Sequence, residues 1–116
     1  MEPITVFIGK ALLCMGMSCQ PVLVGPNTHP GQYQMHVLHT QQPGYGGDVL
    51  MYDSDQKHWF AIHRTYTLDK RRNRAKLYHG TSAKQRKVTS GCINVEPWLY
   101  EQLRENHRTR PLVILP

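Results

Sequence analysis

Short apolar runs separated by turn-forming residues make up most of the chain. Runs with alternating or β-branched apolar positions, typical of strands, occupy residues 4–8, 11–15, 18–24, 32–40, 49–52 and 57–65. Glycine, proline, asparagine and aspartate gather in the segments between them, notably 25–31, 41–48 and 53–56. The pattern predicts a series of short strands that begins as an antiparallel meander.

The hydrophobic period changes near the end of the chain. Glu96-Pro97 opens a segment in which Leu99 and Leu103 recur four residues apart, as they do on one face of a helix. Basic residues in 107–110 suit the end of that helix, and the apolar run 111–116 predicts a closing strand. The expected fold class is therefore mainly β, with one helix and a C-terminal strand.

Length and composition are compatible with one soluble globular domain covering residues 1–116. The chain is 40% hydrophobic and 19% charged. No apolar run approaches the roughly 18 to 20 residues that a membrane span needs. A signal peptide is not visible either, because Glu2-Pro3 replaces a basic first segment and Gly9-Lys10 interrupts the apolar stretch.

Positive charge is concentrated in one stretch of the chain. The formal net charge is +6, and nine of the fourteen Lys and Arg residues lie within 64–87 beside one acid, Asp69. Such a stretch could contact phosphate, an anionic polymer or a substrate carboxylate, or it could be a solvated basic loop. Within it, residues 68–76 suggest one helical turn, and residues 75–79 suggest a short strand that ends at a histidine.

The three cysteines divide into a pair and a single residue. If Gly16-Met17 forms a two-residue turn, Cys14 and Cys19 face each other at a non-hydrogen-bonded pair, close enough for a disulfide. Two half-buried strand residues are the other interpretation of this pair. Cys92 is left over in either case, which suits a reactive thiol.

Cys92 follows Ser90-Gly91 and could occupy a tight turn whose N–H groups converge on a developing oxyanion. A histidine on a neighbouring strand, such as His79, could accept the thiol proton. These are the minimum groups for acyl transfer through a thioester. A buried structural cysteine and a surface histidine remain the alternative, since free cysteine is among the most buried residue types.

The two motifs that carry the candidate chemistry stand in a definite order. His79-Gly80-Thr81 is followed by Thr89-Ser90-Gly91-Cys92-Ile93-Asn94-Val95. This combination resembles the signature of the L,D-transpeptidase catalytic domain, the cysteine enzymes that remodel bacterial peptidoglycan. The likeness extends from about Ile4 to Leu115, with a partial match at 28–33, and it implies a β-sandwich of two packed sheets with one helix after the cysteine turn and a closing C-terminal strand. The chain departs from the common pattern in having Ser90 for histidine and Asn94 for arginine.

The resemblance implies roles for individual residues. Cys92 would be the nucleophile, His79 the base and Gly91 the turn residue, with Ser90 and Gly80 orienting the site. Cys92 would attack the carbonyl of the third residue of a peptidoglycan tetrapeptide stem and expel the terminal D-Ala. An amine, water or a free D-amino acid could then resolve the acyl-enzyme, and the residues do not distinguish these acceptors.

Other side chains are expected near the substrate. His63 ends a predicted strand, so it could contact substrate or replace His79 as the base. Tyr78, Thr81 and Asn94 are the further candidates for substrate binding. No metal or cofactor is expected, because His36 and His39 would point to opposite faces of a strand.

The expected partners follow from the proposed substrate. Peptidoglycan stem peptides lie in the periplasm or cell wall, so a secreted protein, or an effector delivered by a secretion system, would fit. An immunity or delivery protein would then be a further partner, whereas nucleic acid is not expected. The alternatives are a non-catalytic basic β-module that binds nucleic acid or another anionic polymer, and a degenerate transpeptidase fold used for binding.

Overall fold

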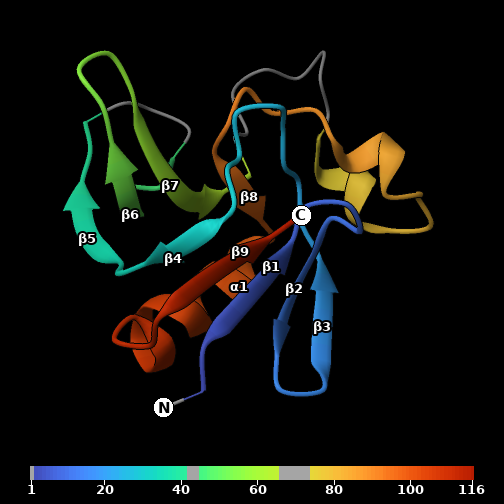
Figure 1. Cartoon of the computed structure of the whole chain (residues 1–116), viewed down its shortest axis with the longest axis horizontal. Helices are drawn as coiled ribbons and strands as arrows, with labels where there is room; N and C mark the ends of the chain where they lie inside the picture. The colour runs from blue at the N-terminus through green and yellow to red at the C-terminus, as the bar shows by residue number, and fades with distance from the viewer. Residues whose placement is uncertain (1, 42–44, 66–73) are drawn as a thin grey trace.

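The computed structural model describes residues 2–41, 45–65 and 74–116, and its strands form two sheets (Figure 1). The first sheet has the order β3-β2-β1-β9-β4 and the second has the order β5-β6-β7-β8. The first sheet comprises β3 (Ser18–Pro21), β2 (Leu12–Met15), β1 (Ile4–Phe7), β9 (Leu112–Leu115) and β4 (Gly31–Tyr33). The second comprises β5 (His36–His39), β6 (Asp48–Ser54), β7 (Trp59–Arg64) and β8 (Ile93–Val95). The predicted mainly β fold with two packed sheets is therefore confirmed.

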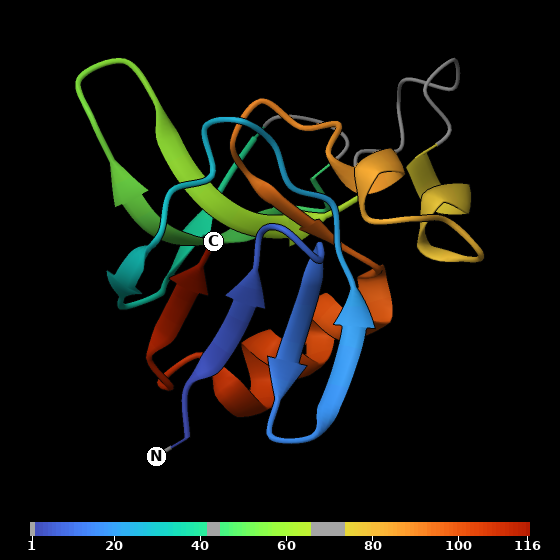
Figure 2. The same ribbon diagram turned by 45° about the vertical axis from the view of Figure 1, so that its right-hand side comes forward.

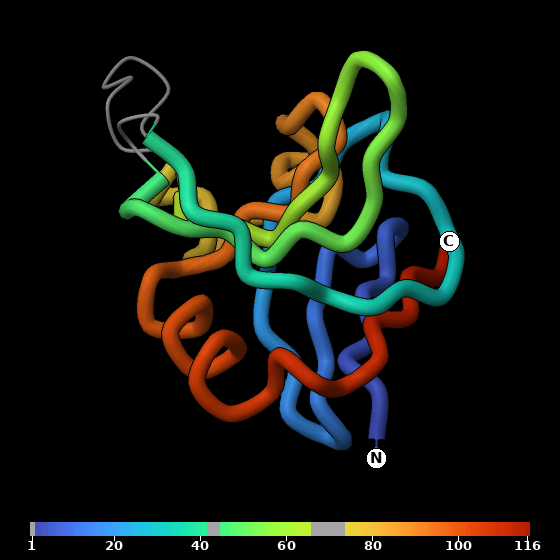
Figure 3. The backbone as a smooth tube through the Cα atoms, turned by 90° about the vertical axis from the view of Figure 1, so that its left-hand side faces the viewer, coloured from blue at the N-terminus to red at the C-terminus, as the bar shows by residue number. Residues whose placement is uncertain are grey.

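The first and last strands of the chain are neighbours in the five-stranded sheet. β1 and β9 run parallel, with Ile4 opposite Leu112 and Phe7 opposite Leu115. Figure 3 shows these two strands, in blue and red, side by side. The predicted closing strand is thus part of the sheet that the N-terminal meander begins.

The β2–β3 hairpin contains a disulfide, which decides between the two interpretations of Cys14 and Cys19. Gly16, with φ of 59°, takes the left-handed conformation in the turn, which suits glycine. Cys14 and Cys19 are register partners with Cα atoms 4.0 Å apart, and they form a disulfide. Cys92 is then the one free cysteine of the chain.

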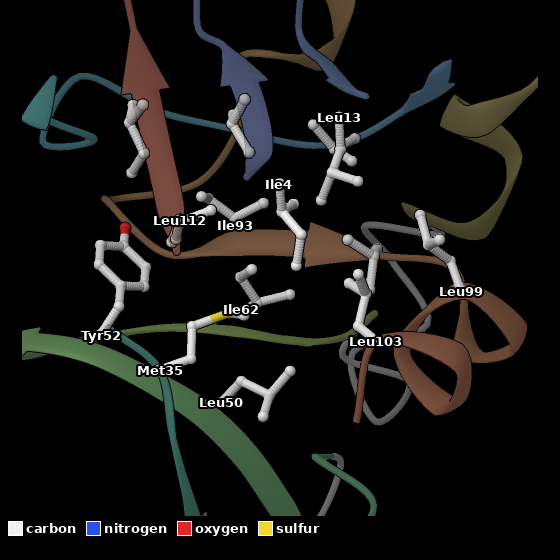
Figure 4. Close-up of a cluster of buried hydrophobic side chains, with 14 of the residues drawn as sticks. Ile4, Leu13, Met35, Leu50, Tyr52, Ile62, Ile93, Leu99, Leu103 and Leu112 are labelled. Carbon is white, nitrogen blue, oxygen red and sulfur yellow. The ribbon is translucent and has the colours of Figure 1, made fainter. Parts of the chain in front are cut away.

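The hydrophobic core lies between the two sheets, where the side chains of alternate strand positions meet (Figure 4). The five-stranded sheet contributes Ile4, Val6, Leu13, Leu112 and Ile114. The four-stranded sheet contributes Leu50, Tyr52, Ile62, Ile93 and Val95. Because Ile93 and Val95 face this core, the β8 residue between them faces the opposite side of the second sheet.

The predicted helix after the cysteine turn is confirmed. α1 (Pro97–Gln102) has proline in its first turn, and it continues as the π-helical segment η3 (Leu103–His107). Leu99 and Leu103 pack into the core from this segment, which lies beside the sheets in Figure 2. No helix among the described residues has both the length and the apolar character needed to cross a bilayer.

One predicted strand proves to be two. The expectation of a single strand over 32–40 was wrong, because the chain leaves one sheet after β4 and enters the other at β5. Met35 lies at this crossing and is buried, with 7% of its surface exposed. Burial of Met35 between the sheets ends the first strand, and the alternating pattern alone did not reveal this break.

The predicted strand at 75–79 was also wrong. The segment forms the short 3-10 helix η1 (Arg74–Tyr78), which is followed by η2 (Lys84–Arg86). The Thr81 hydroxyl donates a hydrogen bond to the carbonyl of Leu77 and so closes the end of η1. Residues 68–73 of the predicted helical turn lie outside the described residues, as do 42–44 of the predicted loop.

Candidate active site

Cys92 lies in the turn that leads into β8, and its thiol is half-buried. Its Sγ is 3.8 Å from the carbonyl oxygen of Trp59 on the neighbouring strand β7. Burial raises the pKa of the Cys92 thiol, although the N–H of Ala61 opposes this by stabilising the thiolate. The resting side chain is therefore a protonated thiol at neutral pH, and attack on a carbonyl requires a base.

Gly91 is required at its position by close packing rather than by an unusual backbone conformation. A Cβ atom there would lie 3.0 Å from the Phe60 ring and 3.1 Å from the Cβ of Asn27. The Phe60 and Asn27 side chains therefore leave little space for a side chain at position 91. Ser90, one residue earlier, is exposed.

A cavity of about 320 Å³ opens beside the Cys92 thiol. Its wall combines aromatic, amide, imidazole and hydroxyl groups, so it could hold a polar peptide segment. It is lined by Asn27, His29, Asp55, His58, Trp59, Phe60, Ser90, Gly91 and Cys92. Cys92 therefore borders a cavity of mixed polar and aromatic character.

Several of these lining residues were missed from the sequence. Asn27 and His29 come from the segment before β4, and Asp55 and His58 come from the β6–β7 turn, which projects at the top of Figure 3. His58 Nδ1 is 3.5 Å from the Asp55 carboxylate, and both side chains are mostly exposed. The partial resemblance at 28–33 was one sequence signal near this wall.

His63 is a buried imidazole on the strand beside Cys92. β7 and β8 run parallel with Ile62 opposite Ile93, so the register places Cys92 alongside Ala61, two residues before His63. Strand spacings of about 4.8 Å across and about 3.3 Å along a sheet place the Cα atoms of Cys92 and His63 roughly 8 Å apart. The His63 imidazole is thus on the strand next to the thiol.

The protonation state of His63 follows from its surroundings. The side chain is 4% exposed, and burial together with the charge of Arg74 lowers the pKa of His63 to about 4. Its Nδ1 is 2.6 Å from the carbonyl oxygen of Arg64. A neutral ring must carry its proton on Nδ1 to donate this bond, which leaves Nε2 unprotonated with a free lone pair. The Tyr45 ring packs edge-on against it, with centroids 4.6 Å apart.

The structure does not bring His79 to Cys92. His79 is highly exposed, and its Nε2 is 3.2 Å from the Glu96 carboxylate. Glu96 lies four residues beyond Cys92, which corresponds to about 13 Å along an extended strand. Gly80 has φ of 69° and no atom within 4 Å of its Cβ position, so it permits the turn after η1 without contacting the cysteine turn.

None of the predicted substrate contacts, His63 included, lines the cavity at Cys92. Tyr78 is buried, and its hydroxyl is 2.6 Å from the Thr65 hydroxyl. Thr81 bonds within the η1–η2 segment, where its carbonyl accepts from Arg86 at 2.7 Å. Asn94 is fully buried beside His63, and its side-chain amide has no hydrogen-bond partner in the described part of the chain.

Two arginines of the basic stretch are used inside the molecule. Arg64 forms ion pairs with Asp48 at 2.9 Å and with Glu101 at 2.5 Å, and its guanidinium stacks over the Tyr100 ring at 4.2 Å. Arg86 is buried and donates to backbone carbonyls, including that of Ala11. These two side chains therefore stabilise the fold, and they are not available to an anionic polymer.

The titratable side chains around Cys92 do not form a metal-binding group. Among residues 2–41, 45–65 and 74–116, no three histidine, cysteine, aspartate or glutamate side chains converge closely enough to hold a metal ion. The chemistry available at this site is that of a thiol, imidazoles and backbone amides.

Comparison with known proteins shows a likeness of fold. No family model matches the chain, and no curated protein matches it. The solved structure of Bd1075 from Bdellovibrio bacteriovorus is similar, with a TM-score of 0.55 and 15% sequence identity. The match covers 98% of this chain and 47% of that one, so the chain spans about half the length of Bd1075. At this identity the likeness shows a shared fold alone.

Proposed function

We propose that this protein is a cysteine acyltransferase or hydrolase that acts on the tetrapeptide stems of peptidoglycan. One observation supports this most directly. Cys92 lines a cavity with polar and aromatic walls, and the adjacent strand holds a neutral imidazole, His63, whose Nδ1 is bonded to a backbone carbonyl. The resemblance of residues 79–95 to the L,D-transpeptidase signature supplies the substrate class.

The base in this proposal is His63, and His79 is not assigned to the reaction. With the His63 ring oriented by the Arg64 carbonyl, its Nε2 accepts the thiol proton as Cys92 attacks the carbonyl of the third stem residue. The tetrahedral intermediate then collapses to a thioester. The C–N bond breaks, and the terminal D-Ala leaves as an amine that takes the proton from the imidazolium.

The second half of the reaction restores the thiol. An amine of another stem, water or a free D-amino acid attacks the thioester and loses its proton to His63. The C–S bond breaks, and Cys92 recovers a proton. The three acceptors give a cross-link, a shortened stem and an exchanged stem, respectively.

The raised pKa of Cys92 and the lowered pKa of His63 mean that both groups are neutral before substrate binds. Both shifts disfavour a resting thiolate–imidazolium pair, since each group is neutral in its buried setting. Proton transfer must therefore accompany attack on the substrate, which is general-base catalysis.

The Cys14–Cys19 disulfide supports a location in the periplasm or cell wall, because disulfides persist in oxidising compartments. This is also where peptidoglycan stems lie. Delivery by a secretion system, with a cognate immunity protein, remains one way in which such a protein could reach that compartment.

The test is incubation with a disaccharide tetrapeptide, alone and with added D-amino acid, with the products identified by mass spectrometry. We expect loss of D-Ala, a cross-linked dimer or exchange of the terminal residue, and Cys92→Ala should abolish each of these. His63→Ala should lower turnover at least about 100-fold, whereas His79→Ala should retain most of it. Unchanged conversion by the Cys92→Ala variant would contradict the proposal.

A further inference from the structure

Two buried threonine hydroxyls hold the peptide groups on either side of Cys92. Thr28 donates to the carbonyl oxygen of Gly91 at 2.8 Å, and Thr89 donates to the carbonyl oxygen of Cys92 at 2.7 Å. Both threonines are nearly fully buried, at 4% and 6% exposure. Neither is a surface hydroxyl, and each is committed to a main-chain acceptor at the candidate nucleophile.

The Thr28 hydroxyl is itself held in place. It accepts a hydrogen bond from the Gly25 N–H at 3.1 Å, and the Thr28 N–H donates to the Gly25 carbonyl at 3.0 Å. Gly25 in turn packs directly on the cysteine turn, since a Cβ there would be 1.7 Å from the Thr89 carbonyl oxygen. The 25–28 turn and the 89–92 turn are therefore joined at two points.

The bond from Thr28 determines the direction of one particular amide. A trans peptide is planar, and its C=O and N–H point in opposite directions. No described peptide bond is cis. By holding the Gly91 carbonyl, Thr28 therefore makes the Cys92 N–H point in the opposite direction, away from the Thr28 hydroxyl.

The Cys92 amide is not used by the sheet. β8 begins at Ile93, so Cys92 precedes the ladder with β7. Within the described ranges, the Cys92 N–H donates to no backbone carbonyl outside the ladder. The Cys92 N–H is therefore not committed to a backbone acceptor in the described part of the chain.

We infer that Thr28 is a positioning residue, which aims the Cys92 N–H at the oxyanion formed when the thiol attacks a carbonyl. The inference rests on the acyl-transfer function proposed above. Donors arranged in advance stabilise the tetrahedral intermediate without reorganisation during the reaction, which is why their orientation matters. Thr28 itself touches neither substrate nor thiol, and it acts only through the Gly91–Cys92 peptide.

The inference separates two properties of Cys92. Stabilisation of an oxyanion needs the N–H direction, so it should fail without the Thr28 hydroxyl. Alkylation by a neutral haloacetamide forms no oxyanion on the protein, so it reports only the thiol pKa and accessibility. A purely structural role for Thr28 would disturb both measurements together.

The test compares Thr28→Val, which keeps the shape but lacks the hydroxyl, with Thr28→Ser, which keeps the hydroxyl. Thr5→Val serves as the matched control, because Thr5 lies on β1 in the other sheet. For Thr28→Val on disaccharide tetrapeptide, we expect kcat to fall about 10- to 100-fold with KM nearly unchanged. Thr28→Ser and the control should stay within about threefold of the wild-type kcat, and all variants should alkylate at the wild-type rate.

Each outcome decides the inference. If Thr28→Val does not fold, Thr28→Ala replaces it, and the same loss of kcat is expected. Wild-type kcat in the folded variant, or a fall in alkylation parallel to that in kcat, would overturn the positioning role alone. A wild-type chain that converts no stem peptide would overturn both this inference and the proposed function.

Discussion

His63 should make the folded protein less stable as the pH falls toward 4. The lowered pKa means that, between the ordinary value of 6.5 and about 4, the unfolded chain binds a proton that the folded chain does not. Stability therefore rises with pH across this window, and it no longer changes through this group outside the window. The sign is that of a buried neutral base that must become charged on unfolding.

The magnitude follows from the difference between the two pKa values. A fall from 6.5 to about 4 corresponds to about 3 kcal/mol at 1.36 kcal/mol per pH unit. This is a large share of the 5 to 15 kcal/mol by which domains of this kind are typically stable. The effect should therefore be plain in an equilibrium unfolding curve.

The assay is urea unfolding at about pH 8 and about pH 4 for the wild type and for His63→Gln, which cannot titrate. Carboxylates such as Asp48 also contribute to acid destabilisation, so the comparison with the variant isolates His63. We expect the wild type to lose about 3 kcal/mol more than His63→Gln between the two conditions. His58→Gln, at an exposed imidazole, is the matched control and should behave as the wild type does.

Two results would refute this reasoning. Equal acid destabilisation of the wild type and His63→Gln would mean that His63 is not kept neutral by burial. An NMR titration that places the His63 imidazole near its ordinary pKa would mean the same. Either outcome would also remove the basis for assigning the neutral ring as the base.

Further predictions concern the thiol, the cysteine turn and the ion pairs. Cys92 alkylation should accelerate with pH to beyond the ordinary thiol pKa of 9.0, because burial raises it, and a plateau below neutrality would indicate a resting thiolate instead. Gly25→Ala should destabilise the fold by about 3 kcal/mol or more, because the added Cβ would overlap the Thr89 carbonyl. Gly9→Ala is the control and should leave stability nearly unchanged, because its Cβ would make only ordinary contacts. Thermal unfolding measures both variants. Asp48→Asn should lower the free energy of unfolding by about 3 kcal/mol, because Arg64 and Arg104 each lose a counter-charge. Asp53→Asn, at an exposed site, should lower it by under about 0.5 kcal/mol. Denaturant midpoints that rank the two variants in the opposite order would contradict this.

Much of the fold could be predicted from local pattern. A two-residue turn between two strands was enough to predict that Cys14 would face Cys19 in a hairpin. The spacing of Leu99 and Leu103 together with Pro97 was enough to predict the helix. The misassigned segments at 32–40 and 75–79 depended on distant packing. In the first, burial of Met35 between the sheets divides one pattern into two strands.

The two candidate histidines show the same contrast between local sequence pattern and distant packing. His79 stands beside a recognisable motif, whereas His63 has only the end of a strand to mark it. Parallel pairing of β7 with β8 places His63 next to the cysteine strand, and the contact with Glu96 holds His79 at the far end of β8. No local spacing encodes either contact, because each joins segments that are distant along the chain.

The amino-acid sequence alone determined the mainly β class, the single cysteine that follows a glycine, and the C-terminal helix and strand. These features depend on residues that are near one another in the chain, where backbone preference and side-chain periodicity decide the outcome. Only the tertiary structure decided which histidine lies on the strand beside Cys92, which residues line the cavity at Cys92 and which hydroxyl holds the Gly91 carbonyl. Those contacts arise when the two sheets close on a shared core, and the free energy of that closure is a property of the whole chain.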